Sequence, residues 1–508
     1  MDTPDMDTNE RFAALRKILA EVGDLGSAAG LLSWDQETYM PKGGLEGRAA
    51  VLSTLAGLAH DAFTGDQVGD LLAGLEEASR AGELSDEQIA LVGETRRDYD
   101  RSVRLPASLV KQLVEARSRA LPAWQQARAE SDFARFRPHL ELLLDLKRQE
   151  AQAIGYRQAP FDALLDQYEA GARQSDLEIL FRDLQRELQP FVRAILDSGI
   201  TVDTMPVRQS FDEERQKAFS AEVVRAMGFD FEAGRIDRAT HPFCSGIHAG
   251  DVRLTWRSQK DDLRPAFFGI VHEAGHGLYE QGLSREWQKT PLGEPASLGV
   301  HESQSRLWEN LVARGRPFWQ YSLPLLKRHF PELQDDIDAE RIYRAVNEVR
   351  PSLIRVEADE LTYNLHIVLR FELECRLFAG ELAAADLPEA WNQKMVELLG
   401  IRPDSDAGGV LQDIHWSMGA FGYFPTYTLG NLYAAQLFEA AERALGELAP
   451  AISRGEFEPL REWLREQVHV HGRRFKPRAL IERATGEAPG QAAFMRYVRR
   501  KFGEIYEL

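Results

Sequence analysis

Residues 262–282 have the sequence DLRPAFFGIVHEAGHGLYEQG and contain the clearest chemical pattern of the chain. Its apolar residues at positions 267, 270, 271, 274 and 278 recur at spacings of three and four, which predicts one face of an α-helix. Pro265 lies near the expected start of this helix and Gly282 near its expected end. Because residues four apart share a helix face, His272 and His276 are predicted to lie side by side.

The same periodicity predicts helices along most of the chain. They cover residues 11–32, 47–59, 86–105, 106–129, 133–154, 175–196, 213–227, 335–349, 356–378, 429–445 and 459–468. In Thr240–Arg257, apolar and polar residues alternate instead, which predicts two short strands joined by a turn at Gly246–Gly250. No linker or repeat interrupts the chain. We therefore expect an all-α protein with a small β-sheet, in which residues 1–508 form a single domain.

Composition excludes several classes of protein. Hydrophobic residues make up 44% of the 508 residues, which is typical of a globular protein. The net charge of -19 disfavours nucleic acid and anionic membranes as partners. Only two cysteines are present, and the N-terminus lacks the basic and apolar segments of a signal peptide. No run of about 18 apolar residues could span a membrane, so we expect a cytoplasmic protein.

The spacing His272-Glu273-Ala274-Gly275-His276 predicts a zinc site with two histidine ligands and Glu273 as general base. A catalytic zinc ion needs a third protein ligand and an open position for water. Glu302 is the predicted third ligand, on a helix that Ser297 can cap. Two alternatives need no metal: the histidines could pack or lie exposed, and Glu302 could simply pair with Arg306 one turn on.

Further segments extend this interpretation beyond the zinc motif. In chain order they are His241–Phe243 (HPF), Asp251–Thr255 (DVRLT), His272–His276 (HEAGH), His301–Gln304 (HESQ), Ile354–Asp359 (IRVEAD) and Gly409–Trp416 (GVLQDIHW). Together they resemble the carboxypeptidase Taq family of zinc metallocarboxypeptidases. The resemblance implies a nearly all-helical fold with two lobes around a deep substrate groove and the small sheet next to the active site. It also implies a homodimer, zinc with cobalt able to serve, and broad release of C-terminal residues from peptides.

A tetrahedral oxyanion would need hydrogen-bond donors close to the metal. His415 and Tyr427 are the candidates, since they flank a segment similar to the Gly-Tyr…Tyr segment of related helical zinc peptidases. Tyr423 in that segment competes with Tyr427 for the role. Either tyrosine could instead pack in the core with its hydroxyl satisfied.

A carboxypeptidase also has to bind a free carboxylate, which arginine does best. Arg355 is the first candidate, and the alternative for it is an ion pair with Asp359 on one helix face. Arg253 is the second, or else a solvated strand residue, and His241 either lines the site or is structural. Asp359 and Asp413 are candidates to accept hydrogen bonds from the ligand imidazoles.

Three other functions share part of this evidence. A zinc oligopeptidase or endopeptidase would use the same ligands and differ only in how the substrate docks. A zinc hydrolase of non-peptide amides would fit the same spacing. A non-catalytic helical binding protein with a degenerate site is a different class, which the intact His272, Glu273, His276 and Glu302 disfavour. We therefore expect a zinc carboxypeptidase acting on peptides with a free C-terminus.

Overall fold

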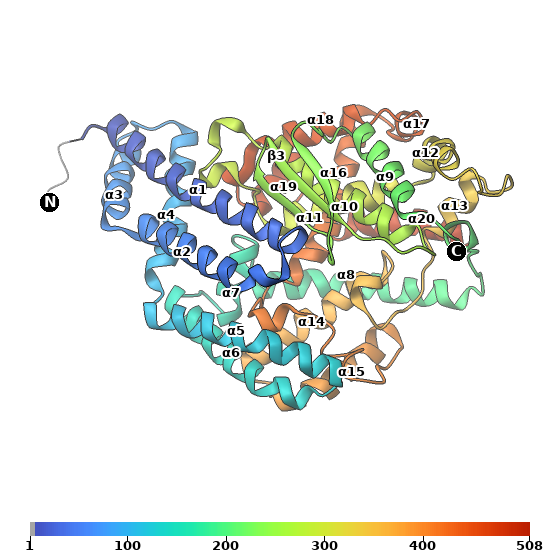
Figure 1. Ribbon diagram of the computed structural model, residues 1–508, viewed down its shortest axis with the longest axis horizontal. Helices are drawn as coiled ribbons and strands as arrows, with labels where there is room; N and C mark the ends of the chain where they lie inside the picture. The colour runs from blue at the N-terminus through green and yellow to red at the C-terminus, as the bar shows by residue number, and fades with distance from the viewer. Residues whose placement is uncertain (1–5) are drawn as a thin grey trace.

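The computed structural model describes residues 6–508 (Figure 1). Helices make up about 70% of the protein and the sheet is small, so the predicted fold class is confirmed. The first ten helices are α1 (Thr8–Thr38), α2 (Leu45–Thr64), α3 (Asp66–Arg80), α4 (Asp86–Arg104), α5 (Ala107–Glu130), α6 (Phe133–Ile154), α7 (Pro160–Tyr168), α8 (Gln174–Asp197), α9 (Glu213–Met227) and α10 (Arg264–Gly282). The remaining helices are α11 (Leu298–Arg306), α12 (Arg316–His329), α13 (Ala339–Ala345), α14 (Thr362–Ala379), α15 (Leu387–Leu399), α16 (Pro425–Leu445), α17 (Ala449–Ser453), α18 (Glu458–Gln467), α19 (Pro477–Thr485) and α20 (Ala492–Tyr506).

Two predicted helices, 356–378 and 335–349, differ from the structure. The helix expected from 356 begins only at Thr362, because the Asp359 carboxylate accepts hydrogen bonds from the backbone of Leu361 and Thr362 and thereby caps α14. Residues Arg355–Glu357 form a separate 3₁₀ turn, η6. Of the helix expected over 335–349, only α13 is α-helical.

The sheet contains strands β1 (Gly234–Arg238), β2 (Cys244–His248) and β3 (Asp251–Trp256) in the order β1-β3-β2. The antiparallel pair β2–β3 confirms the predicted strands, although β2 continues to His248 and the turn is shorter than expected. Strand β1 was not predicted because Ile236 is its only apolar side chain, which leaves no alternation to detect. It pairs with β3 in parallel.

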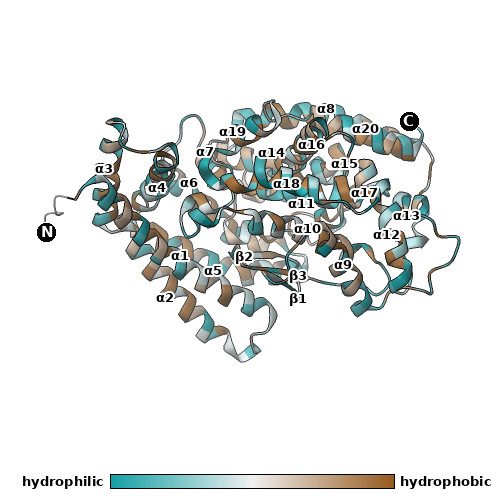
Figure 2. Ribbon diagram, turned by 90° about the horizontal axis from the view of Figure 1, so that it is seen from above, coloured by the Kyte–Doolittle hydropathy of each residue, from teal (hydrophilic) through white to brown (hydrophobic). Residues whose placement is uncertain are grey.

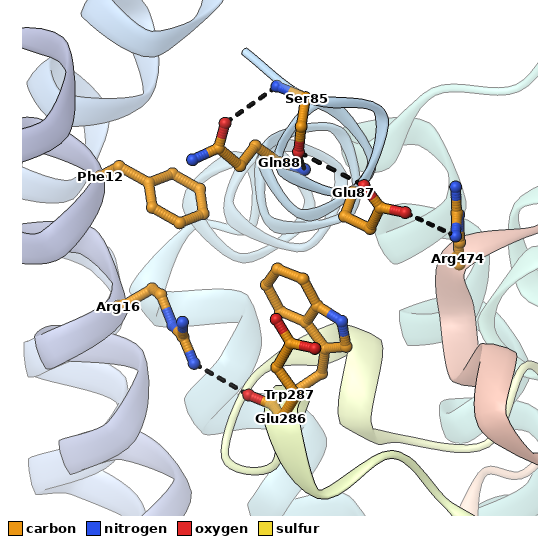
Figure 3. Close-up of a pocket in the computed structure, with 8 residues that line it drawn as sticks. All are labelled: Phe12, Arg16, Ser85, Glu87, Gln88, Glu286, Trp287 and Arg474. Atoms are coloured by element: carbon orange, nitrogen blue, oxygen red, sulfur yellow. Dashed lines mark hydrogen bonds and ion pairs between the residues drawn. The ribbon is translucent and has the colours of Figure 1, made fainter.

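Buried apolar residues form two clusters within the described part of the chain. The larger cluster draws on segments from α5 to α20. The smaller one joins α1, α3 and α4, at one end of the molecule in Figure 1, with Leu292 from the main body. Polar contacts cross the seam between them: the Arg16 guanidinium donates to the Glu286 carbonyl, and Arg474 pairs with Glu87. These residues line a cavity of about 480 Å³ (Figure 3).

Helix α10 is the element around which the rest of the site is arranged. It packs against β2 and β3 on one side and against α9 and α11 elsewhere, and Figure 2 shows it between the strands and α11. Helix α11 in turn packs closely on α16. The sheet, α11 and α16 therefore gather around α10, which carries the motif His272–His276. Within residues 6–508, every helix is too short or too polar to cross a membrane.

Candidate metal centre

Helix α10 carries His272, Glu273 and His276. It starts as predicted, with Pro265 in its first turn and the Asp262 carboxylate accepting a hydrogen bond from the backbone N–H of Arg264 at 2.9 Å. The two imidazole rings lie on one face with their centroids 4.9 Å apart. The spacing of four thus brings both rings together, as a shared metal would require.

Helix α11 brings Glu302 to the two imidazoles. The Ser297 hydroxyl caps this helix, as predicted, by accepting a backbone hydrogen bond at 3.0 Å. Two glycines allow the close approach of neighbouring helices. A Cβ on Gly275 of α10 would lie 2.6 Å from the Ser305 Cα, and a Cβ on Gly430 of α16 would lie 2.7 Å from the Glu302 Cβ. Any larger side chain at either position would push Glu302 out of place.

One carboxylate oxygen of Glu302 faces both imidazoles. Its Oε2 lies 3.6 Å from the His272 Nε2 and 3.4 Å from the His276 Nε2, and one ligand atom from each residue lies within 4.8 Å of the others. We call these three residues the metal set. Two imidazole nitrogens and one carboxylate suit zinc and leave a coordination position for water. The other oxygen, Oε1, accepts from the Arg306 Nε at 2.7 Å, so the predicted ion pair and the ligand geometry coexist.

Burial and neighbouring charges set the protonation of the metal set. Burial lowers the pKa of His276 to about 3, so its imidazole is neutral and able to bind a metal. Burial also disfavours the charged form of His272, but the carboxylates of Glu302 and Glu309 outweigh it and raise the pKa. For Glu302, Arg306 and the imidazoles outweigh burial and hold the pKa well below its usual range. The carboxylate is therefore anionic.

Hydrogen bonds at Nδ1 orient both imidazoles. The His272 Nδ1 hydrogen-bonds to the Glu309 Oε2 at 2.9 Å, and the His276 Nδ1 donates to the His301 carbonyl at 3.0 Å. These bonds leave both Nε2 atoms directed at the common point. Glu309 lies seven residues after Glu302, in the π-helical segment Leu307–Ala313 that continues α11, and that short spacing was the available indication of its position.

The aspartates expected to orient the imidazoles have other roles. Asp359 caps α14. Asp413 binds two arginines, Arg355 at 2.8 Å and Arg370 at 2.6 Å. Neither candidate aspartate contacts His272 or His276 among the hydrogen bonds of residues 6–508.

Glu273, the predicted base, follows His272 directly on α10. It is buried, and within residues 6–508 its carboxyl group has no side-chain hydrogen bond. Burial raises the pKa of Glu273 to about 7, against the opposing effect of His272. A carboxyl group with a pKa near the working pH can both accept and return a proton.

His415, Tyr423 and Tyr427 form one polar and aromatic cluster. The His415 Nε2 lies 3.2 Å from the Tyr427 hydroxyl, and the Tyr423 ring lies 5.4 Å from the Tyr427 ring. Burial lowers the pKa of His415 to about 3, so the ring is neutral. Burial, followed by the nearby Glu302 carboxylate, raises the pKa of Tyr423 to about 12. The cluster is thus within electrostatic reach of the metal set.

Arg355 lies beside this cluster, paired differently from the sequence expectation. Its Nε and Nη2 donate to the Asp413 Oδ1 at 3.1 and 2.8 Å, and its Nη1 donates to the Tyr363 hydroxyl at 2.9 Å. Its Cζ is 4.9 Å from the centre of the Tyr427 ring. The alternative explanation of Arg355, an ion pair with Asp359, is wrong, because that carboxylate accepts hydrogen bonds at the start of α14.

With this geometry established, comparison with known proteins identifies the family. Residues 14–502 match the family described as carboxypeptidase Taq (M32) metallopeptidase. The chain belongs to this M32 family. The predicted resemblance is therefore confirmed over nearly the whole chain, and the protein is a metal-dependent carboxypeptidase.

Individual relatives support the assignment to the M32 family. Thermostable carboxypeptidase 1 of Thermus thermophilus is 44% identical over 504 residues, covering 97% of this chain and 99% of the relative. Carboxypeptidase 1 of Bacillus subtilis is 39% identical, covering 97% of this chain and 98% of the relative. The crystal structure of an M32 carboxypeptidase from Deinococcus radiodurans R1 has a TM-score of 0.95 at 42% identity, covering 98% of this chain and all of that one. The same fold thus extends over the full length.

Arg253 and His241 are the remaining predicted substrate contacts. Arg253 donates to both oxygens of Asp251 at 2.8 and 2.9 Å, and its Cζ lies 4.3 Å above the ring of Trp34 on α1. His241 is exposed in the segment before β2. Among residues 6–508, no hydrogen bond or ion pair links either side chain to the metal set. Their roles as substrate contacts stay predictions.

Glu309→Ala is expected to weaken zinc binding about 10- to 100-fold, because His272 loses the partner that orients it. Competition with a chelator measures this affinity. Glu340→Ala is a matched control, since Glu340 also pairs with two arginines, Arg316 and Arg344, but far from the metal set in the fold. Zinc affinity equal to that of the unmodified protein would show that Glu309 does not orient His272.

Proposed function

We propose that this protein releases residues one at a time from the free C-terminus of peptides, with a zinc ion held by His272, His276 and Glu302. The convergence of two Nε2 atoms on one Glu302 oxygen, with Glu273 on the same helix, is the observation that carries the proposal. Zinc, when bound, polarises the scissile carbonyl and lowers the pKa of a water molecule.

The chain's own residues supply the proton transfers. Glu273 takes a proton from the attacking water and delivers it to the leaving amine. Its raised pKa, about 7, suits both halves of this exchange. Because Glu273 follows His272 directly on α10, it lies beside the metal set instead of joining it.

The oxyanion that forms on the scissile carbonyl is stabilised by Tyr427. Neutral His415 with a hydrogen on Nε2 donates to the Tyr427 oxygen and so frees the phenolic hydrogen for the oxyanion. Tyr423 is the competing donor on the same cluster. Glu374 fixes the backbone between them, since its carboxyl group accepts from the Trp416 indole and from the backbone of Gly422.

Arg355 binds the substrate's terminal carboxylate. Asp413 and the Tyr363 hydroxyl hold the guanidinium beside Tyr427, which supports this role by reducing the entropy lost on binding. Arg253 and His241 are proposed as additional substrate contacts.

Arg355→Ala is expected to raise KM for peptides with a free carboxylate by about 10- to 100-fold, the usual worth of a charged hydrogen bond. KM for the matching C-terminal esters should change far less. Steady-state kinetics on acid and ester pairs measures the difference. Arg350→Ala, a change at an exposed arginine nearby, is the control. An equal effect on acids and esters would remove Arg355 from carboxylate binding.

We further propose that cobalt can replace zinc and that the protein is a cytoplasmic homodimer. The two free cysteines, Cys244 and Cys375, support a reducing compartment. Leu45, Val51 and Leu58 of α2 are 57, 48 and 53% exposed, an apolar surface that a second copy would cover. We also propose that residues 1–508 form one domain and that the acidic surface excludes nucleic acid.

A timed digest of one unmodified peptide, followed by mass spectrometry, tests the proposed direction of cleavage. A ladder of products shortened from the C-terminus is expected, and a C-terminal amide should block it. Internal fragments, or cleavage of the amide, would favour the endopeptidase alternative.

A further inference from the structure

A second cavity, of about 450 Å³, adjoins the metal set. Two of its lining residues touch the site. The His301 ring stacks on the His276 ring with centroids 4.2 Å apart, and the Tyr168 ring meets the Tyr423 ring at 5.1 Å. Residues that bind Arg355 do not line the cavity. The cavity and the proposed carboxylate-binding end are therefore separate parts of the site.

The lining carries an excess of negative charge. Its three guanidiniums, of Arg97, Arg101 and Arg473, face four carboxylates, of Asp98, Asp166, Glu280 and Glu294. Each arginine is already bound to a carboxylate: Arg97 and Arg101 to Asp166, and Arg473 to Asp98 and Glu294. The charges of these three arginines are thus matched by carboxylates of the same lining.

Glu280 is the carboxylate left over. Within residues 6–508 its one ion-pair or side-chain hydrogen-bond partner is the His301 Nε2, at 2.9 Å. A half-buried carboxylate that no arginine or lysine pairs with attracts a positive group. Glu294 lies in the segment between α10 and α11. It is paired with Arg473, but its side chain is 61% exposed, so it can also approach a ligand.

The position of Glu280 relative to the metal set indicates which part of a bound peptide would reach this cavity. Glu280 follows His276 by four residues on α10 and therefore shares the face that carries the ligands. One helical turn advances about 5.4 Å, and one residue of extended peptide advances about 3.3–3.6 Å. A substrate whose scissile bond lies at the metal set would bring a group one or two residues upstream to Glu280.

We infer that this cavity, the cationic subsite, binds a positive group one or two residues upstream of the scissile bond. The α-ammonium of a tripeptide and the side chain of lysine or arginine share the required chemistry. The inference rests on the proposed function, because it takes the peptide to run from Arg355 across the metal set into the cavity. It makes short peptides with free amino groups, and peptides with an upstream basic residue, the preferred substrates.

Two substrate pairs distinguish the sources of charge. Ala-Ala-Phe is compared with N-acetyl-Ala-Ala-Phe, and N-acetyl-Lys-Ala-Phe with its norleucine analogue. The charged member of at least one pair is expected to have a kcat/KM about tenfold higher, the worth of one charge-assisted hydrogen bond. Calorimetry of the same peptides on the zinc-loaded Glu273→Gln protein gives a readout that needs no turnover.

Substitutions test whether Glu280 and Glu294 cause the preference for the charged peptide. Glu280→Gln and Glu294→Gln should each reduce the preference for the charged peptide, while metal content, measured for both, stays at one equivalent. Glu286→Gln is the matched control, because Glu286 lines the other cavity (Figure 3). Equal kcat/KM and equal affinity within both pairs, or a preference that survives both variants, would overturn the subsite. Failure of the proposed function looks different: no C-terminal ladder forms from any peptide, while the binding data still report on the subsite.

Discussion

Glu302→Ala is expected to leave the purified protein without bound zinc and without measurable peptidase activity. Only two imidazoles would remain, and the sole anion of the metal set would be gone. The loss of affinity should exceed the roughly 100-fold that marks the removal of an orienting partner. Metal analysis after dialysis, together with kcat/KM, measures the two consequences.

Folding has to be separated from metal binding in this experiment. Removing Glu302 leaves Arg306 without its closest carboxylate, so the thermal unfolding of the metal-free variant is compared with that of the metal-free unmodified protein. Glu302→Asp, which keeps a shortened carboxylate, should retain part of the zinc. One full equivalent of zinc in Glu302→Ala would show that the third ligand is another residue.

Glu273→Gln is expected to lower kcat by about 10²–10⁴-fold, the usual contribution of a general base. Zinc should stay near one equivalent, since the glutamate lies beside the metal set and contributes no ligand atom to it. KM should change little, because the substrate still meets the same ligands and the same Arg355. Metal content and steady-state kinetics on one peptide measure both quantities.

Glu273→Asp is the matched control for this variant. It keeps a carboxylate one methylene further from the water, so it should fall between the glutamine variant and the unmodified protein. If Glu273→Gln lost zinc and activity together, Glu273 would be a structural support of the site instead of its base.

Local patterns predicted the elements of the site well. Helical periodicity and the spacing of four located α10 and its two imidazoles, and the Ser297 cap located the helix that carries Glu302. The spacing and the cap each depend on residues within about one helical turn of each other, so a single sequence reveals them. Strand β1 was not predicted because one apolar residue gives no alternation. The start of α14 was predicted too early because the apolar period continues past the Asp359 cap.

Partners distant in the sequence could not be predicted in this way. Arg355 and Asp413 are 58 residues apart in the sequence. The group that orients His276 is the His301 carbonyl, and every residue has a backbone carbonyl, so the sequence does not indicate which one is used. Glu302 does pair with Arg306, as the alternative explanation held, and its other oxygen faces both imidazoles. Tertiary packing decides such contacts, and only the folded chain displays them.

The most direct test of the metal set is a crystal structure of the zinc-loaded protein with diffraction recorded on both sides of the zinc absorption edge. We expect one anomalous peak, about 2.0–2.2 Å from the His272 Nε2, the His276 Nε2 and a Glu302 carboxylate oxygen. A peak elsewhere, or one that leaves Glu302 outside bonding distance, would contradict it.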